Sequence, residues 1–480
     1  MIDFLAMWQK IVQWPERKWL IIVLLAISFV TQFMWLSYPR EVVFDEVHFG
    51  KFVTAYCCTG ERFFDIHPPH AKLLIAGVAY LAGYEGGMSF ANISQSYGDI
   101  SPVGLRLIPV IMGTLLPLLV FMLLRQLGAS WAAAFFGGLL IAFDNAFTVQ
   151  NRIISLDGVL LVSIVGSLSA YLRVEELVEL KKVGTWRWVM FSILTGGLAG
   201  LAVGAKFTGL AIGGLIGVLI CLRLLKSIAW GELVRWIVTV LVIVVSGLVV
   251  YGAGWILHFT LLPLPGSGDA WGVAQWDKPI VTSFVRETVN LHKTMYRANY
   301  DLTATHPDAS KWWSWPWMQT SVYYWQYSGV AADGIGKRVG TIYFLGNPVV
   351  WWGSGVVFVL ALVHIVIRRV KGLSVRAVLG NKGWILIIGY IIAFAPLIRV
   401  PRALFLYHYL TPLIFSIMVG VLWLDKLRWF REGSVWRQPK RYFVVIGVLA
   451  LFFVIMSPLT YGFLLSPELQ KLLFWLDTWR

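Results

Sequence analysis

The sequence predicts an all-α polytopic membrane protein with about eleven transmembrane helices, and three observations support this fold class. Of the 480 residues, 58% are hydrophobic, 15% are aromatic and only 14% are charged, which exceeds the apolar content of ordinary soluble chains. Apolar runs of about 17–25 residues, long enough to cross a bilayer core, recur along the whole chain. Basic residues gather in alternate segments between these runs, as they do in cytoplasmic loops of membrane proteins.

The apolar runs expected to cross the membrane cover residues 19–36, 103–124, 131–149, 156–172, 188–205, 207–222, 236–262, 347–367, 383–398, 403–424 and 442–461. The run at 131–149 contains Asp144 and Asn145, and the runs at 188–205 and 207–222 are short and rich in glycine. These three therefore differ most from an ordinary span. The first run is too long for a cleaved signal peptide and lacks a small-residue cleavage site, so we expect it to be retained.

The distribution of lysine and arginine predicts the orientation of the chain. More than half of the 40 basic residues fall in the short segments 1–18, 125–130, 173–187, 223–235, 368–382 and 425–441. This bias predicts a cytoplasmic N-terminus, an extracytoplasmic C-terminus and a multi-pass protein of the plasma or inner membrane. The net charge of +15 needs no nucleic acid partner, because a basic rim beside anionic membrane lipid accounts for it.

Two long segments, 37–102 and 263–346, are expected to lie outside the cell, and no linker separates them from the spans. The whole of 1–480 is therefore predicted to form a single domain. An apolar run at 72–83, about twelve residues long, suits an interfacial or re-entrant helix better than a span. Tryptophan and tyrosine are frequent between 312 and 327, which is typical of the lipid headgroup level, with stacking on sugar rings as the alternative.

The three cysteines predict no covalent framework. Cys57 and Cys58 are sequence neighbours, which is poor geometry for an ordinary disulfide, and Cys221 lies in an apolar run. We therefore expect neither a disulfide framework nor a cysteine metal site.

Two adjacent carboxylates, Asp45 and Glu46, follow the first span. Repulsion between them raises the pKa of one, which can then act as a general base while its neighbour holds a partner. The alternative is a helix start, where acidic side chains complement the helix dipole. Position alone does not separate the two interpretations. Downstream, His67 and His70 have a spacing that suits a metal, but Pro68 and Pro69 disfavour the helix that would align them, so a metal site is the weaker interpretation.

Several further ionisable residues lie in or beside the spans, where charged groups are costly and mark functional sites. They are Arg106, Arg152, Asp157, Lys206, Arg399, Arg402 and His408. Arginine forks suit phosphate oxygens, and the alternative is mutual salt bridging or snorkelling to the interface. The pattern favours phosphate-linked lipid chemistry outside the cytoplasm, with a lipid-phosphate transporter as the alternative.

Five motifs resemble the protein O-mannosyltransferases, glycosyltransferase family 39 of the GT-C class. They are FDEVHFGKF at 44–52, FDIHPPHAKLLIA at 64–76, RIISLD at 152–157, SKWWSWP at 310–316 and FLYHYLTP at 405–412. The matches occur in the family's order over nearly the whole chain. The first two together are highly specific, whereas each of the others alone is weak.

This resemblance implies a GT-C fold with eleven spans and inverting transfer of mannose from a polyprenyl-phosphate-mannose to Ser or Thr hydroxyls of translocated proteins. It implies that Asp45 is the base, that Glu46 positions the acceptor or the sugar, and that Arg106 lies near the donor. Other residues expected at the donor phosphate are Arg152, Lys206, Arg399, Arg402 and His408. Residues expected to support the site are His48, His67 and Asp157.

Eukaryotic members of this family carry β-trefoil MIR repeats in the second outside loop. The segment 263–346, about eighty residues long, lacks room for such an array, so we expect a prokaryotic form without a MIR domain and with a polyprenol rather than a dolichol donor. Secreted or membrane protein acceptors and the translocon are the expected partners. We expect a metal-independent enzyme, with a divalent cation as the alternative, and a GT-C transferase for a glycan or lipid acceptor as the alternative function.

Overall fold

The computed structural model describes residues 19–225, 229–271, 280–301, 305–330, 337–374, 376–430 and 439–480. A helix lies at each of the eleven predicted spans. Eight helices are long and apolar enough to cross a membrane, and the helices at 19–33, 131–142 and 384–399 are shorter. The predicted mostly helical, multi-pass membrane fold is confirmed. The basic residues at 1–18, 226–228 and 431–438, which contribute to the predicted orientation, lie outside the described residues.

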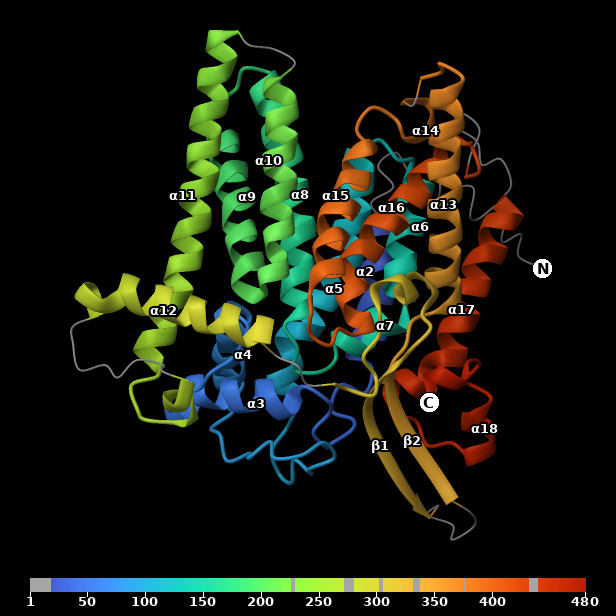
Figure 1. The fold of residues 1–480 in the computed structure, drawn as a ribbon. Coiled ribbons are helices and arrows are strands. Elements are labelled where there is room, and N and C mark those ends of the chain that lie inside the picture. The colour runs from blue at the N-terminus through green and yellow to red at the C-terminus, as the bar shows by residue number, and fades with distance from the viewer. Residues whose placement is uncertain are drawn as a thin grey trace.

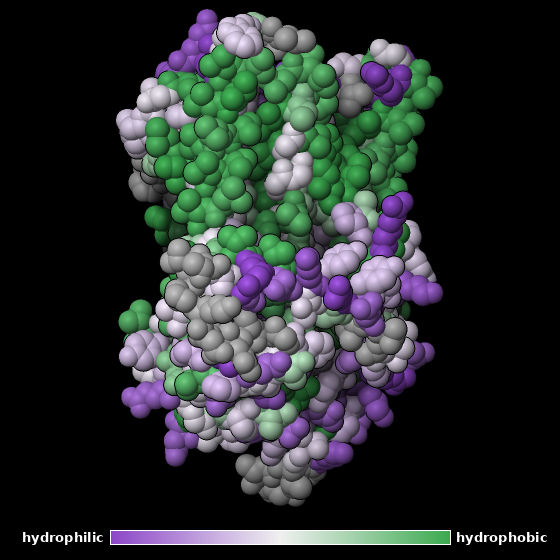
Figure 2. All heavy atoms as spheres, turned by 60° about the vertical axis from the view of Figure 1, so that its left-hand side comes forward, coloured by the Kyte–Doolittle hydropathy of each residue, from purple (hydrophilic) through white to green (hydrophobic). Residues whose placement is uncertain are grey.

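The long helices form a block with a second layer of elements at one end (Figure 1), and the surface of the block is apolar whereas that of the layer is more hydrophilic (Figure 2). The block contains α2 (Trp19–Phe33), α5 (Val103–Gln126), α6 (Trp131–Ala142), α8 (Asp157–Glu179), α9 (Trp186–Ala205), α10 (Leu210–Leu224), α11 (Trp230–Leu261), α13 (Pro348–Val370), α15 (Trp384–Phe394), α16 (Leu410–Lys426) and α17 (Pro439–Tyr461), with the short α7 (Asn145–Gln150) and α14 (Arg376–Leu379). The layer contains α3 (Glu46–Thr54), α4 (His70–Leu81), α12 (Ile280–Asp301), the strands β1 (Val322–Val330) and β2 (Lys337–Phe344), and α18 (Pro467–Lys471).

Glycine lets the central helices approach closely. Helix α8 is the most buried of the long spans and packs against α5 and α9, and α9 also packs against α11. A Cβ atom added to Gly200 of α9 would lie 2.4 Å from the Gly247 carbonyl oxygen of α11. The glycines of the 188–205 run therefore serve helix packing, because small residues let membrane helices approach closely.

The apolar run at 72–83 lies in α4, which is twelve residues long and too short to span a bilayer. Helix α4 packs against α5, α9 and α11 at the end of the block. The His70 ring at its start fits between two glycines: a Cβ on Gly204 or on Gly254 would come within 2.3 Å of the imidazole. The His70 Nε2 atom lies 3.0 Å from the Val250 carbonyl oxygen.

A two-stranded antiparallel hairpin in the second outside segment is an addition to the predicted helices. Strands β1 and β2 pair from Val322 and Phe344 to Val330 and Lys337. The prediction that the aromatic residues of this segment lie at the lipid headgroups is wrong for Trp315, Tyr324 and Trp325, which are buried in the core. The Trp315 ring stacks on His408, and Tyr324 and Trp325 belong to β1, where Trp325 Nε1 donates to a Glu41 carboxylate oxygen at 2.8 Å.

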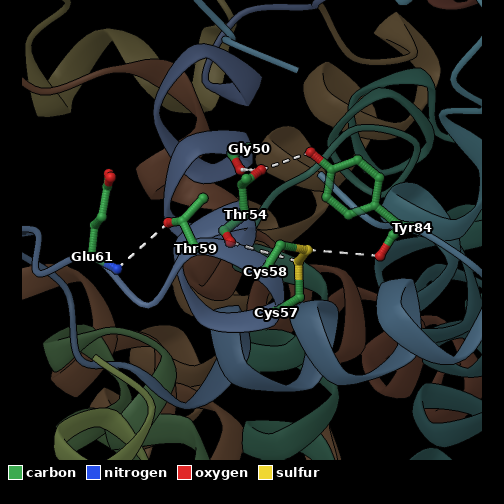
Figure 3. The surroundings of a disulfide bond; sticks show 7 residues. All are labelled: Gly50, Thr54, Cys57, Cys58, Thr59, Glu61 and Tyr84. Carbon is green, nitrogen blue, oxygen red and sulfur yellow. Dashed lines mark hydrogen bonds between the residues drawn. A yellow bond between two sulfur atoms is a disulfide. The ribbon is translucent and has the colours of Figure 1, made fainter. Parts of the chain in front are cut away.

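The prediction of no disulfide is wrong, because Cys57 and Cys58 are bonded to each other (Figure 3). The prediction rejected the pair because sequence neighbours lie closer together than the cysteines of an ordinary disulfide, yet the bond forms here with the two Cα atoms 3.7 Å apart. The pair lies in a π-helical turn, Ala55–Thr59, that follows α3 directly. The Cys58 Sγ atom lies 3.7 Å from the Tyr84 carbonyl oxygen, so the pair borders the segment that follows α4.

Figure 1 places α3, α12, the hairpin and α18 at one end of the molecule, opposite the α8–α9 and α13–α14 connections. We therefore predict that cysteines introduced at 48, 290 and 478 react with a membrane-impermeant thiol reagent from one side, and cysteines at 181 and 369 only from the other. All five positions are exposed, whereas Glu46 is fully buried and unsuitable as a reporter.

The measurement is labelling of sealed and opened vesicles in a background without Cys57, Cys58 and Cys221. Opened vesicles, in which every position should react, are the control for accessibility. Labelling of 48 but not of 290 from the same side would contradict the fold, because an odd number of spans between them would then be required.

Candidate functional site

The first outside segment is fixed to the membrane helices through the Glu46 carboxylate, which is completely buried. Glu46 accepts hydrogen bonds from Arg106 Nε at 2.8 Å and from Arg106 Nη2 at 3.0 Å. It also accepts from the backbone N–H groups of Val43 at 2.9 Å and Ile154 at 3.1 Å, and from the Tyr97 hydroxyl at 3.2 Å. One carboxylate thus joins the start of α3, the helix α5 and the chain before α8.

The Arg106 guanidinium is equally saturated. Besides Glu46, it donates to the carbonyl oxygens of Leu36 at 3.2 Å, Pro39 at 3.1 Å and Glu41 at 3.2 Å, and its side chain is 1% exposed. Neither Arg106 nor Glu46 is among the residues that line the two cavities described below. Their hydrogen bonds hold the first outside segment against the spans, and their expected contacts with donor and acceptor stay predictions.

Asp45, by contrast, has a carboxylate without a hydrogen bond or ion pair to any residue of the described ranges. It occupies the N-cap position of α3, yet its side chain makes no capping hydrogen bond. The side chain is half-buried and lines a cavity of about 670 Å³. Burial raises the pKa of Asp45 to about 7, aided by the negative charges of Asp157 and Asp65 and opposed by Lys206 and Arg402. The helix-start interpretation thus accounts for the position of Asp45 but not for its unused carboxylate.

The cavity beside Asp45 is lined by aromatic rings and a few polar groups. Its walls include His48, Phe49, Phe52, Phe64, Asp65, His67, Trp271, Arg297, Asp301, Arg402, Phe405 and Tyr407. Asp65 pairs with the fully buried Lys72, whose ammonium also donates to the His67 carbonyl oxygen at 2.7 Å. Aromatic faces with fixed polar groups are suited to a peptide or a sugar.

A second cavity of about 480 Å³ begins at the end of α9 and extends between apolar side chains. Its apolar wall includes Leu160, Leu161, Leu210, Ala393, Leu397, Leu404 and Leu410. Its polar end includes Asp157, Lys206, Arg402 and His408. Lys206 Nζ binds both Asp157 oxygens, at 2.8 and 2.9 Å, and Gln150 Nε2 donates to Asp157 at 2.6 Å. An apolar wall ending in cations matches an isoprenoid chain that ends in a phosphate.

Ile66, His67, Arg402 and Tyr407 line both cavities. Arg402 makes no hydrogen bond or ion pair with any residue that the structure describes, so its donors are available to a ligand. Burial, together with the neighbouring Lys206, Lys72 and Arg402, lowers the pKa of His67 well below its usual range. His67 is therefore a neutral side chain between the cavities.

The remaining predicted residues divide into two groups. His48 lines the Asp45 cavity and His408 lines the apolar one. Arg152 is buried away from both, where it donates to the carbonyl oxygens of Gln32 at 2.6 Å and Trp35 at 2.9 Å, and Arg399 is exposed outside both. Within the described ranges, no three His, Cys, Asp or Glu side chains converge as metal ligands.

Residue-by-residue reasoning missed Tyr407, Asp65 and Lys72 as site residues, although all three stand in the motifs that carry the family resemblance. Tyr407 lies beside His408, and Asp65 and Lys72 flank the His-Pro-Pro-His run. Their positions within those motifs could have marked them as candidate site residues. Arg297 and Trp271 had no such signal, because they reach the cavity only through the placement of α12 and the turn before it.

Comparisons with known proteins agree with this architecture. Residues 22–263 match the family model of dolichyl-phosphate-mannose-protein mannosyltransferases, and residues 284–479 match the model of the C-terminal four-helix membrane region of protein O-mannosyltransferases. Dolichyl-phosphate-mannose–protein mannosyltransferase 4 of Schizosaccharomyces pombe is 34% identical over 272 residues, which cover 55% of this chain and 34% of that protein. The matched region thus spans about a third of the relative's length.

Solved structures show the same fold at low sequence identity. The Saccharomyces cerevisiae Pmt1-Pmt2 complex bound to the sugar donor aligns over 96% of this chain and 92% of the compared chain, with a TM-score of 0.83 and 19% identity. The oligosaccharyltransferase AglB of Archaeoglobus fulgidus aligns over 95% and 57%, with a TM-score of 0.53 and 13% identity. The fold is therefore that of the GT-C class. With a family model that covers half of its residues, this chain belongs to the dolichyl-phosphate-mannose-protein mannosyltransferase (PMT) family.

Proposed function

We propose that this protein transfers mannose from a polyprenyl-phosphate-mannose to Ser or Thr hydroxyls of protein acceptors. One observation carries the proposal: the Asp45 carboxylate and the Arg402 guanidinium, neither bonded to any residue that the structure describes, line one cavity, and Arg402 also lines the apolar cavity beside it. The apolar cavity would hold the isoprenoid chain, with the phosphate at Lys206 and Arg402. The aromatic cavity would hold the acceptor segment and the sugar.

The chemistry needs a base on one side of the sugar and cations on the other. A serine or threonine hydroxyl is a weak nucleophile, so Asp45 takes its proton as the hydroxyl oxygen bonds to the anomeric carbon. The bond from that carbon to the phosphate oxygen breaks, and the oxygen leaves with the electron pair. Attack opposite the leaving group inverts the anomeric configuration. Arg402 and Lys206 stabilise the charge that develops on the phosphate.

We infer the side of the membrane on which this reaction occurs from the distribution of basic residues among the loops. We place the cavities on the extracytoplasmic side, because the more basic connections lie at the opposite end of the spans. Acceptors would then be secreted or membrane proteins during or after translocation. The described part of 263–346 consists of helices and one hairpin, and the two family matches leave only 264–283 between them, so we assign the chain to the form without a MIR array.

Replacing Asp45→Asn should preserve folding and donor binding but reduce mannose transfer by roughly 10²–10⁴-fold, because the variant keeps the shape and loses the base. The measurement is transfer from polyprenyl-phosphate-mannose into a Ser/Thr peptide at matched protein levels. Wild-type transfer to a glycan or lipid acceptor but not to the peptide would favour the alternative GT-C transferase. Normal turnover by the variant would remove Asp45 from its role.

The rate should also depend on pH through this carboxylate. The pKa of Asp45 is raised to about 7, and only the deprotonated form accepts a proton, so activity should fall as the pH decreases through about 7 and level off above it. The measurement is kcat/KM between pH 5 and 9, with Asp45→Asn as the control whose residual rate should lack this step. A wild-type rate that stays constant down to pH 5 would contradict the assignment.

Arg402→Gln should lower kcat/KM for the lipid donor by roughly tenfold or more, because a charge-assisted contact to phosphate is worth about 1.5–3 kcal/mol. Arg399→Gln is the matched control. It removes the same charge, and Arg399 lies three residues before Arg402 but lines neither cavity. Equal effects of the two substitutions in a titration with the donor would refute the phosphate contact.

A further inference from the structure

Helix α12 has one apolar face packed on the protein and another that is bare. It lies across the end of α11 rather than along the spans (Figure 1). Phe284, Leu291 and Met295 pack against Trp255 and Phe259 of α11. This inner face accounts for the position of the helix.

The outer face carries a second apolar stripe. Val285, Val289, Tyr296 and Tyr300 are 71%, 45%, 69% and 62% exposed. At 100° per residue, these four side chains fall within an arc of about 60°. Figure 2 shows the apolar surface of the spans giving way to hydrophilic residues near the height at which α12 lies. A bare apolar stripe at that level is suited to the boundary between headgroups and acyl chains.

Cations border this stripe along one side. Lys293 and Arg297, one turn apart, are exposed and make no hydrogen bond or ion pair with any other described residue. Arg286, farther along the same edge, pairs with Glu287 at 2.9 Å. Between α11 and α12 lies a groove of about 510 Å³, whose lining includes Tyr251, Thr288, His292, Lys293, Tyr296 and Arg297. The two unpaired cations therefore share a groove that opens beside the apolar stripe.

We propose that this groove binds the phosphate headgroup of an anionic glycerophospholipid from the surrounding bilayer. Lys293 and Arg297 contact the phosphate, and the acyl chains lie along the stripe of Val285, Val289 and Tyr296. A free phosphate ion would use the cations alone, whereas the adjoining apolar stripe favours a lipid. The proposal depends on the membrane location of the chain and not on the proposed mannose transfer.

The site has a consequence for the neighbouring cavities. His292 and Tyr296 line both the groove and the apolar cavity, and Arg297 lines both the groove and the Asp45 cavity. Helix α12 is therefore the wall between the groove and the two cavities. A bound phospholipid steadies that wall from outside.

The test uses the full chain in nanodiscs, with a fluorophore on a cysteine at position 300, which lies on the stripe but outside the groove lining, and brominated lipids as quenchers. Brominated phosphatidylglycerol should quench several-fold more than brominated phosphatidylcholine at equal mole fraction, and the difference should shrink as salt is raised. Lys293→Gln should reduce the ratio of quenching by brominated phosphatidylglycerol to quenching by brominated phosphatidylcholine at least about threefold. Arg286→Gln, which removes the same charge from the same helix outside the groove, should leave it unchanged.

Three outcomes would overturn the proposal. They are equal quenching by the two lipids, equal effects of Lys293→Gln and Arg286→Gln, and loss of the preference on adding millimolar inorganic phosphate at constant ionic strength. The last result would identify a site for free phosphate instead. If Lys293→Gln does not fold, the lipid comparison and its salt dependence in the wild-type background still decide the question.

Discussion

The buried pair of Glu46 and Arg106 is the interaction on which the position of the site depends. Removing two such charges from water costs several kcal/mol per ion, and only saturated hydrogen bonding offsets that cost. Here each group has a full set of partners, drawn from α3, α5, the chain after α2 and the turn before α8. Loss of either partner would leave an unpaired buried charge, at a cost of about 3–5 kcal/mol. The pair therefore sets where α3, and with it the neighbouring Asp45, lies relative to the spans.

Two adjacent acids consequently have opposite surroundings. Successive residues at a helix start point about 100° apart, so when Glu46 faces the protein interior, Asp45 faces the cavity. Glu46 receives hydrogen bonds from Arg106, Tyr97 and two backbone N–H groups, whereas the pKa of Asp45 is raised by burial and by two further carboxylates against the opposing charges of Lys206 and Arg402. The environment, rather than the residue type, separates a positioning group from a candidate base.

The sequence predicted the membrane helices well, because each depends on a local run of apolar residues. It also singled out Asp45, which stands in a motif, Arg402, which lies just before one, and Lys206, which separates two apolar runs. It could not decide which arginines line a cavity, since Arg106 and Arg152 donate to carbonyl groups of residues 32–41 that only the folded chain brings close. The β1–β2 hairpin and the Cys57–Cys58 bond were missed for similar reasons: one depends on pairing across a turn, and the other departs from the usual spacing of disulfides.

The residues that line both cavities lie where the proposed reaction moves charge. Asp45 loses one negative charge when it accepts a proton. The phosphate of the donor gains up to one negative charge when the phosphodiester becomes a monoester. A unit of negative charge thus migrates from the acceptor side to the lipid side during each turnover, and the total charge of the active centre changes little. Arg402, which lines both cavities, is adjacent to the origin and to the destination of that migration.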